Sequence, residues 1–258
     1  MTTMSTTGAP LLEARGIQKH FGHVVALASA NFELAPNEVH AIVGDNGAGK
    51  STLIKIVSGV YHADGGELLL DGKPITISNP REARQLGIET VYQDLALADH
   101  LDAAANLFLG REEYLPGLLG RLGFLDRKTM RRRAEEEMRR LKIGIKSVDQ
   151  AVVNLSGGQR QAVAVARAIA WGRRIVIMDE PTAALGVRES SMVLELIKEV
   201  RSHGLSIIMI SHNLPEVFAV ADRITVLRLG RTIRTLRTSE TTLEAVVGMM
   251  TGAVGVAA

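Results

Sequence analysis

Short, mainly apolar runs alternate with helical patterns along most of the chain. Residues 39–43, 175–178 and 206–210 have the length of strands, and segments with helical periodicity lie between them. Continuous apolar strands are buried on both faces, as in a parallel sheet that is covered by helices on both sides. The pattern therefore predicts an α/β fold with a mainly parallel sheet.

Two regions depart from this pattern. Residues 11–43 alternate short apolar runs with turns such as Phe21-Gly22-His23, which predicts strands. Residues from about 95 to 160 are helical and loop-rich, which predicts an inserted helical subdomain. We expect one domain over residues 11–250, a disordered segment over 1–10 and a tail over 251–258.

The most charged predicted helix covers residues 127–141. Glu135 with Arg139, and Glu136 with Arg140, have the i,i+4 order that stabilises an exposed helix. A run of arginines is also found on nucleic-acid surfaces, but the interleaved acids favour a solvated helix. The formal net charge of only +2 agrees with this, so we expect no nucleic-acid partner.

A glycine-rich segment, GDNGAGKS, joins an apolar strand to a helix-forming run at residues 44–51. It has the G-x-x-x-x-G-K-S spacing of a phosphate-binding loop, in the required order of strand, loop and helix. Glycines let backbone N–H groups surround an oxyanion, and the positive end of the following helix adds to the attraction. The lysine reaches the β- and γ-phosphates, and the serine ligates Mg²⁺. The predicted nucleotide contacts are Gly44, Asp45, Asn46, Gly47, Ala48, Gly49, Lys50, Ser51 and Thr52.

A pair of carboxylates ends the buried strand at residues 175–178. Ligands of parallel sheets lie beyond the carboxyl ends of the strands, so Asp179 and Glu180 are expected beside the nucleotide. Asp179 is a candidate Mg²⁺ ligand, and Glu180 is a candidate base for the attacking water. Because side chains alternate along a strand, the two acids can serve different roles. Without a further motif, kinases, GTPases, motors and transport ATPases all remain open.

The segment LSGGQRQ at residues 155–161 narrows the choice. Ser156 has a hydroxyl to donate, Gly157 and Gly158 expose backbone N–H groups, and a helix begins there that attracts anions at its N-terminus. By itself the segment also fits an ordinary helix cap. Beside the phosphate loop and the carboxylate pair, it resembles the signature sequence of ATP-binding-cassette (ABC) proteins.

The resemblance implies the fold and roles of that family. The fold is the P-loop ABC ATPase core, with a mainly parallel sheet, an N-terminal antiparallel β subdomain and an inserted helical subdomain. The signature of one subunit, Ser156 to Gln159, closes over the ATP held by its partner. Gln93 resembles the Q-loop glutamine, which contacts Mg²⁺ or water, and Phe21 resembles the aromatic residue that stacks on adenine. His212 resembles the switch histidine, which donates to the γ-phosphate. On this basis the catalytic residues are Lys50, Glu180 and His212, and the metal ligands are Ser51, Gln93 and Asp179.

One position departs from the family pattern. The stretch after Glu180 usually ends with an aspartate that contacts the partner subunit, but here Gly186 stands in its place. The residues needed for hydrolysis are nevertheless all present. We therefore expect hydrolysis, with communication between the two ATP sites that differs from the usual kind.

Several stretches resemble the ATPases of bacterial monosaccharide importers, namely residues 44–51, 87–93, 106–112 and 178–186. The single cassette is similar to the fructose-type importers. The resemblance implies a homodimer that binds ATP and Mg²⁺ under two multi-span permease subunits, fed by a periplasmic sugar-binding protein. It places the chain peripherally on the cytoplasmic face of the inner membrane.

Two other functions are compatible with an ABC cassette. One is a soluble ATPase that acts on nucleic acid or ribosomes, and the other is an exporter ATPase. The first usually needs long insertions, zinc-binding cysteines or two cassettes, whereas this chain has no cysteine and one phosphate loop. The absence of cysteine also excludes disulfides and thiolate catalysis.

Overall fold

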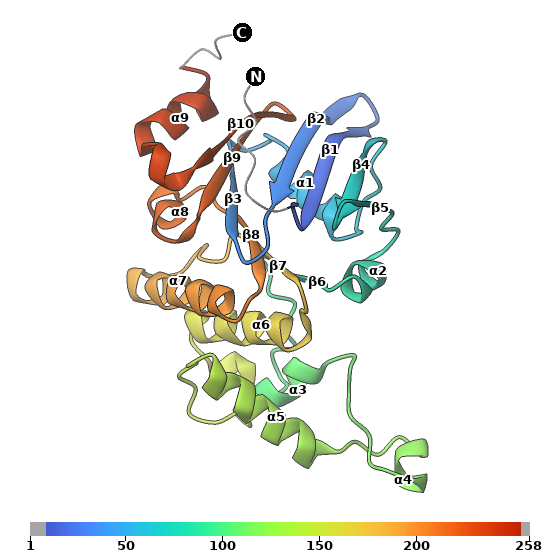
Figure 1. Ribbon diagram of the computed structural model, residues 1–258. Coiled ribbons are helices and arrows are strands. Elements are labelled where there is room, and N and C mark those ends of the chain that lie inside the picture. The colour runs from blue at the N-terminus through green and yellow to red at the C-terminus, as the bar shows by residue number, and fades with distance from the viewer. Residues whose placement is uncertain (1–8, 254–258) are drawn as a thin grey trace.

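The computed structural model describes residues 9–253, which form a ten-stranded sheet with helices around it (Figure 1). The strand order is β5-β4-β1-β2-β10-β9-β3-β8-β7-β6. In chain order the strands are β1 (Leu12–Phe21), β2 (Val24–Leu34), β3 (Val39–Val43), β4 (Gly65–Leu70), β5 (Lys73–Ile75), β6 (Ile88–Val91), β7 (Ile175–Asp179), β8 (Ser206–Ile210), β9 (Arg223–Arg228) and β10 (Arg231–Arg237).

The sheet has a parallel part and an antiparallel part. Strands β9, β3, β8, β7 and β6 run parallel, whereas β1, β2, β4 and β5 pair antiparallel. The two parts meet at β10, where Arg231 pairs with Ser29 of β2. The predicted mainly parallel sheet with an antiparallel region near the N-terminus is therefore confirmed.

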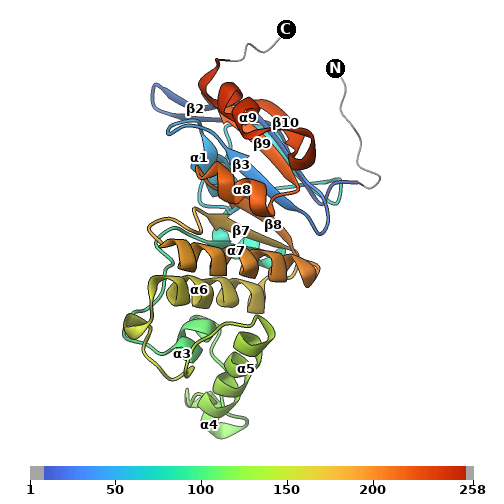
Figure 2. The same ribbon diagram turned by 90° about the vertical axis from the view of Figure 1, so that its left-hand side faces the viewer.

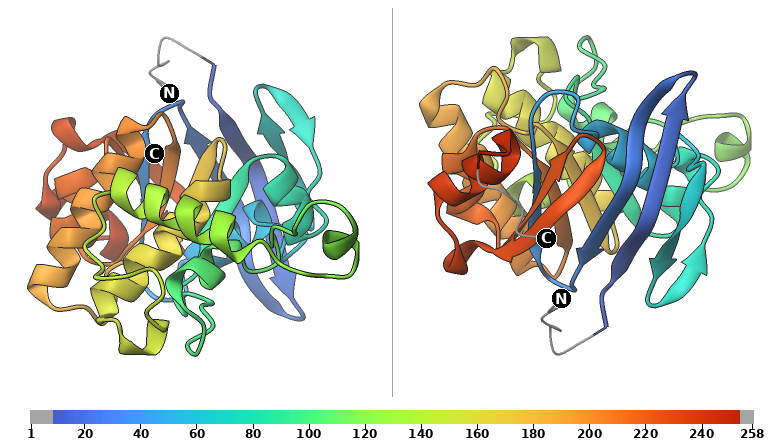
Figure 3. Two further views of the ribbon diagram at one scale, coloured as in Figure 1. Left: turned by 90° about the horizontal axis from the view of Figure 1, so that it is seen from below. Right: turned by 90° about the horizontal axis from the view of Figure 1, so that it is seen from above.

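Helices cover the parallel part on both faces and continue beyond it. They are α1 (Lys50–Val57), α2 (Pro80–Gln85), α3 (Ala103–Phe108), α4 (Leu118–Arg121), α5 (Arg127–Arg140), α6 (Gly157–Trp171), α7 (Val187–Ser202), α8 (Leu214–Val220) and α9 (Leu243–Thr251). Figure 2 shows α7 and α6 below the sheet, with α3, α5 and α4 further away. Seen from below, α5 lies across α6 and α7, and the segment around α4 projects from the edge (Figure 3).

Two hydrophobic cores lie on opposite faces of the parallel strands. Along β7, Val176 and Met178 pack into the core with α6 and α7, while Ile175 and Ile177 pack into the core with α1. Strand β8 divides its side chains in the same way. Burial on both faces explains why these strands are apolar throughout. The sheet thereby holds its carboxyl ends, and the loops after them, in fixed positions.

The ion pairs predicted along α5 are wrong. Arg131 pairs with Glu135 and Arg132 pairs with Glu136, so each of these glutamates binds the arginine four residues before it. Each glutamate has an arginine at four residues on both sides, so the spacing alone did not decide between them. Arg131 also reaches Asp149, a contact from outside the helix that the periodicity does not reveal.

Some expectations fall at the limits of the described chain. Of the predicted disordered segment and tail, residues 1–8 and 254–258 lie outside the described residues. The boundaries of the helical subdomain near 95 and 160 stay a prediction. Between residues 9 and 253, no helix combines the length and the apolar character that a membrane span requires.

Candidate functional site

The phosphate loop lies where β3 ends and α1 begins. All three of its glycines have positive φ angles, 156° at Gly44, 80° at Gly47 and 104° at Gly49. A Cβ atom on Gly49 would stand 2.6 Å from Cδ2 of Leu27 and 2.8 Å from the Ala26 oxygen. A Cβ on Gly44 would stand 2.3 Å from the Leu227 oxygen. The loop can follow this path only because these residues have no side chain.

Lys50 is held inside the loop that it belongs to. Its Nζ donates to the carbonyl oxygen of Gly44 at 2.7 Å and to that of Asp45 at 3.0 Å. Burial lowers the pKa of Lys50, while Glu180, Asp45 and Asp179 act in the opposite direction. A buried ammonium at the centre of a glycine-rich loop is suited to hold a polyanion such as a triphosphate.

A cavity of about 500 Å³ opens beside the loop. It collects residues from the predicted motifs that are far apart in the sequence: Phe21, Asn46, Gly47, Ala48, Gly49, Lys50, Ser51, Thr52, Gln93, Asp179, Glu180 and His212. Gly44 and Asp45 do not line it, but their carbonyl groups hold Lys50. The structure thus brings together most of the predicted site residues in one place.

The two carboxylates at the end of β7, Asp179 and Glu180, both line this cavity. Alternation along a strand instead predicts that their side chains point in opposite directions. The reason is local: Asp179 ends the strand, and Glu180 has a left-handed φ of 52°. Its N–H still donates to the Ile210 oxygen at 2.9 Å, so the sheet holds this unusual backbone in place. Such strained residues are concentrated at functional sites. Burial, followed by the nearby charge of Glu180, raises the pKa of Asp179.

His212 contacts the candidate base directly. Its Nδ1 lies 2.9 Å from Oε1 of Glu180. The imidazole is largely exposed, with 69% of its side-chain surface accessible, whereas the Glu180 side chain is 16% exposed. The exposed imidazole and the mostly buried carboxylate thus form one hydrogen-bonded pair at the cavity wall.

The donors around the loop suit a magnesium ion. The Ser51 hydroxyl, the Gln93 amide and the Asp179 carboxylate line the same cavity and offer oxygen ligands. Mg²⁺ prefers oxygen and commonly takes one or two carboxylates together with substrate phosphates. The described residues contain no cluster of three or more His, Cys, Asp or Glu side chains that would hold a metal without a substrate.

An apolar rim borders the cavity beside Phe21. The ring of Phe21 is 42% exposed and packs edge-on against Tyr61, with centroids 5.2 Å apart. Val24 and Val25 lie next to it with 65% and 52% of their surface exposed, and both line the cavity. Sequence analysis missed these valines, together with Ala26 and Ala183. The sequence feature that could have revealed the valines is their position as an apolar pair directly after the Phe21-Gly22-His23 turn.

The signature segment does not reach this cavity. Ser156 caps α6: its Oγ accepts from the Gln159 N–H at 3.3 Å, and its own N–H donates to Oε1 of Gln159 at 3.0 Å. A Cβ on Gly158 would stand 2.9 Å from the Cβ of Glu189 on α7, so the two helices approach closely here. The N–H of Gly158, the Ser156 hydroxyl and the N–H of Gly186 lower the pKa of Glu189.

Gly186 lies at the exposed start of α7. Its N–H donates weakly to Oε2 of Glu189 at 3.4 Å. The neighbouring Val187 is 86% exposed, which is unusual for so large an apolar residue. The position that carries an aspartate in the family is therefore a solvent-facing turn next to the signature segment, outside the cavity of its own chain.

Comparisons with known proteins agree with this geometry. The model of the ABC transporter family matches residues 27–183. The chain is 54% identical to the fructose import ATP-binding protein FrcA of Rhizobium meliloti, over 95% of both chains. It is 46% identical to the xylose/arabinose import ATP-binding protein XylG of Sulfolobus acidocaldarius, over 93% of this chain and 94% of that one.

Solved structures show the same fold. A cassette of an ABC transporter superposes with a TM-score of 0.81 and 26% identity, covering 95% of this chain and 98% of that chain. A nucleotide-free cassette gives a TM-score of 0.77 at 26% identity, covering 93% and 98%. The expectation of an ABC cassette is therefore confirmed. The chain belongs to the ABC transporter family, as one of its ATP-binding cassettes.

Proposed function

We propose that this chain is the ATP-hydrolysing subunit of an importer for a monosaccharide, with fructose as the first sugar to test. The observation that carries the proposal is the likeness to FrcA over 95% of both chains, combined with a phosphate loop, Asp179, Glu180 and His212 around one cavity. XylG, a xylose/arabinose import protein, is similar over nearly its whole length as well. The likeness therefore favours import over export and over action on nucleic acid.

The cavity supplies the groups that ATP hydrolysis needs. Lys50 and the N–H groups of the loop bind the β- and γ-phosphates. Glu180 takes a proton from water as the water oxygen attacks the γ-phosphorus, and the bond to ADP breaks to release phosphate. His212 donates to the γ-phosphate, and its contact with Glu180 keeps the two side chains close. When bound between Ser51, Gln93 and Asp179, Mg²⁺ neutralises phosphate charge.

The second half of the site comes from another copy of the chain. The signature segment and the phosphate loop both present helix N-termini, but only the loop lines the cavity. A homodimer places the signature of one copy, from Ser156 to Gln159, over the nucleotide held by the other. ATP then stabilises the closed dimer, and hydrolysis reopens it.

The closing dimer acts on membrane subunits. We propose that two multi-span permease subunits bind this chain at the cytoplasmic face of the inner membrane, and that a periplasmic protein delivers the sugar. Residues from about 95 to 160, which carry α3, α4 and α5, move as a helical arm between Gln93 and the signature. The cassette itself does not contact the sugar.

Sugar-stimulated hydrolysis tests the proposal. The chain is co-purified with its permease, reconstituted in vesicles, and supplied with periplasmic binding protein and fructose, ribose or xylose. We expect hydrolysis to rise with one sugar and with binding protein present, and Glu180→Gln to remove the rise. Stimulation by none of the sugars contradicts import of these monosaccharides, and a preference for ribose or xylose corrects the substrate only.

A further inference from the structure

The exposed apolar residues are most concentrated on one loop. Residues 113–126, the α4 loop, leave the body of the protein after α3 and return to it at α5, and Figures 1 and 3 show them projecting from its edge. Each of five large apolar residues on the loop has more than half of its surface exposed: Tyr114, Leu118, Leu119, Leu122 and Phe124. No separate stretch of that length within residues 9–253 exposes as many. Such patches indicate a surface that binds a partner or a membrane.

Backbone contacts, rather than packing of the apolar side chains, hold the α4 loop in shape. Its two ends pair in an antiparallel bridge, where the N–H of Leu115 donates to the Phe124 oxygen at 2.9 Å. Next to the bridge, the N–H of Asp126 donates to the Glu113 oxygen at 2.7 Å. Inside the loop, a Cβ on Gly120 would stand 1.9 Å from the Leu115 oxygen. The apolar side chains are therefore presented on an ordered backbone, and little backbone entropy remains to be lost on binding.

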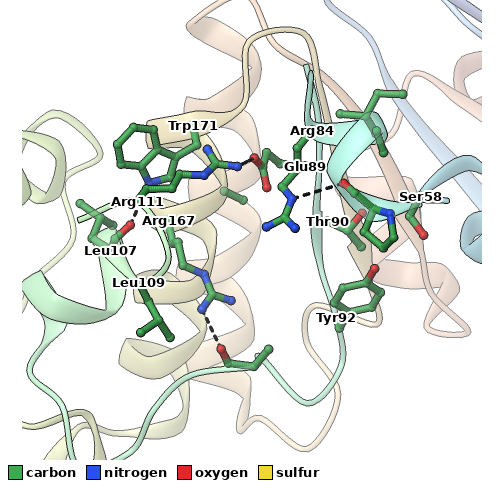
Figure 4. Close-up of a pocket in the computed structure, with 15 residues that line it drawn as sticks. Ser58, Arg84, Glu89, Thr90, Tyr92, Leu107, Leu109, Arg111, Arg167 and Trp171 are labelled. Carbon is green, nitrogen blue, oxygen red and sulfur yellow. Dashed lines mark hydrogen bonds and ion pairs between the residues drawn. The ribbon is translucent and has the colours of Figure 1, made fainter. Parts of the chain in front are cut away.

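The base of the loop is fixed to the body by arginine contacts. Arg111, two residues before the loop, forms an ion pair with Glu89 of β6, and its Cζ lies 4.9 Å from the centre of the Trp171 ring on α6 (Figure 4). Arg133 of α5 forms an ion pair with Glu113, the first residue of the loop. A binding event at the loop therefore positions the whole cassette.

Positive charge surrounds the apolar side chains. Residues 110–134 contain seven basic and three acidic side chains, in a chain whose formal net charge is only +2. Arg121 ends α4, and Arg127 and Lys128 begin α5 directly after the loop; all three are exposed. Among the residues that the structure describes, these three have no ion pair, whereas the arginines at 131–133 have carboxylate partners. Because the first turn of a helix favours acidic residues, Arg127 and Lys128 do not serve the stability of α5.

We propose that the α4 loop binds the anionic surface of the membrane directly. The exposed leucines enter the boundary between headgroups and acyl chains, while Arg121, Arg127 and Lys128 lie against lipid phosphates. The proposal rests on the proposed function, which places the chain at the cytoplasmic face of the inner membrane, and adds a contact with lipid that needs no permease.

The shape of the loop favours a bilayer over a folded partner. Successive residues of a helix point about 100° apart, so Leu118 and Leu119 expose apolar surface on two sides of the loop. A bilayer surrounds such a projection on every side, whereas a folded protein would need a deep cup of matching shape. A few leucines or a few cations alone bind a membrane weakly, and stable attachment takes two signals. The α4 loop supplies both, so its binding should require anionic lipid and weaken with salt.

Flotation with vesicles that contain no permease tests the proposal. The full-length ATPase is mixed at low salt with vesicles of phosphatidylcholine alone, or of an equal mixture with phosphatidylglycerol. The test variants are Leu122→Asn and Arg127→Gln. Their controls are Val247→Asn on α9 and Arg234→Gln on β10, which change exposed residues of similar kind at the opposite end of the protein (Figure 1). Each control makes the same change in polarity or net charge, so only the location differs.

We expect the wild type to bind the anionic vesicles and not those of phosphatidylcholine alone. Arg127→Gln should lower the partition coefficient by about fivefold, as the loss of one basic residue near an anionic surface predicts. Leu122→Asn should lower it by about tenfold, because a leucine leaves the apolar region. Both controls should bind like the wild type. Hydrolysis in solution, unchanged in Leu122→Asn and Arg127→Gln, shows that the variants are folded, since neither residue lines the nucleotide cavity.

Three results overturn the proposal. The first is no binding of the wild type to anionic vesicles, or binding only to vesicles that contain the permease. The second is an equal loss in Arg234→Gln and Arg127→Gln, which would make net charge the cause. The third is self-association that Leu122→Asn removes while vesicle binding is absent, which would assign the loop to a second copy. Sugar-stimulated hydrolysis is measured separately with the permease, so its failure is distinct from failure of lipid binding.

Discussion

α1 begins after a glycine-rich loop and α6 begins with two glycines, yet the N-termini of these helices are capped differently. At α1, Gly49 offers no side chain to cap the helix, and the first residues of the helix, Lys50 to Thr52, line the nucleotide cavity. At α6, Ser156 and Gln159 cap each other, and the carboxylate of Glu189 lies close to the same N–H groups. One helix end is open to an anion, whereas the other already has partners.

This difference suggests an order of events. An uncapped helix end with a nearby lysine binds phosphate in a single chain, since no internal contact has to be broken. The capped end of α6 binds phosphate only when the gain exceeds the contacts that it already makes. We therefore propose that the phosphate loop is the primary binding site and that the signature responds to the nucleotide of a second copy.

The largest effect is expected at the group that activates water. Glu180→Gln keeps the size of the side chain but removes the base, so we expect turnover to fall by about 10²–10⁴-fold. ATP affinity is retained because the phosphate loop is unchanged. The measurement is steady-state hydrolysis together with light scattering in Mg²⁺–ATP, where the variant is expected to accumulate as a dimer. Turnover close to that of the wild type removes Glu180 from its role, and a strictly monomeric variant contradicts the two-copy site.

Asp179→Asn separates stability from activity. The pKa of Asp179 is raised in the folded protein, so the folded state holds its proton to a higher pH than the unfolded chain. The free energy of unfolding therefore falls as pH rises through that range, and the ionised carboxylate destabilises the protein at neutral pH. The variant lacks this charge, so we expect its melting temperature without nucleotide to rise by about 2–4 °C at pH 7.

The same variant is expected to lose hydrolysis by about 100-fold, because the carboxylate that we propose as a Mg²⁺ ligand is gone. Calorimetry across pH provides the internal control: the gain in melting temperature should shrink as pH falls and Asp179 of the wild type becomes protonated. A variant that melts earlier than the wild type at neutral pH would show that the Asp179 charge is well compensated by Lys50 and Lys55.

Sequence reasoning was strongest where one local pattern determines the structure. The phosphate loop requires glycine at φ angles that other residues avoid, and strands buried on both faces require continuous apolar runs, so both could be predicted. The pairs along α5 could not, because Glu135 and Glu136 each had two arginines within reach. The direction of the Glu180 side chain could not be predicted either. The apolar pattern of β7 does not reveal that Glu180, the residue after the strand, has a positive φ.

Contacts between distant segments were harder still. A cavity lined by Arg84, Arg111 and Arg167 brings together residues from segments that lie far apart in the sequence. Each arginine lies in a segment that looks ordinary by itself. Only the packing of α2, α3 and α6 places them side by side, and packing depends on shape that periodicity does not encode.

The two helix ends can also be compared by adding one methyl group to each. At Gly49, where φ is 104°, an alanine side chain would meet Leu27 and the Ala26 oxygen within 2.8 Å, so we expect ATP affinity to fall by about tenfold or more. At Gly157 the φ is not positive, and the nearest atom is Cδ2 of Leu185 at 3.0 Å. Gly157→Ala should therefore leave ATP binding by one chain unchanged, as measured with a fluorescent ATP analogue. Equal losses in both variants would contradict the distinction between the two helix ends.

The smallest expected effect concerns the carboxylate beside α6. The Glu189 carboxylate interacts with the Ser156 hydroxyl and the N–H of Gly158. In the proposed dimer, these same donors bind the γ-phosphate of the ATP that the second copy holds. The two negative charges then repel each other. Glu189→Gln should therefore strengthen ATP-driven dimerisation by roughly threefold, within the range that one charge at a helix end produces. The measurement uses the Glu180→Gln background and light scattering across ATP concentrations.

Glu195→Gln is the matched control, because Glu195 lies on the same helix and pairs only with Lys198 among the described residues. A weaker dimer in Glu189→Gln would instead make Glu189 a residue that positions the signature, and α6 would then need its internal anion in order to bind the external one.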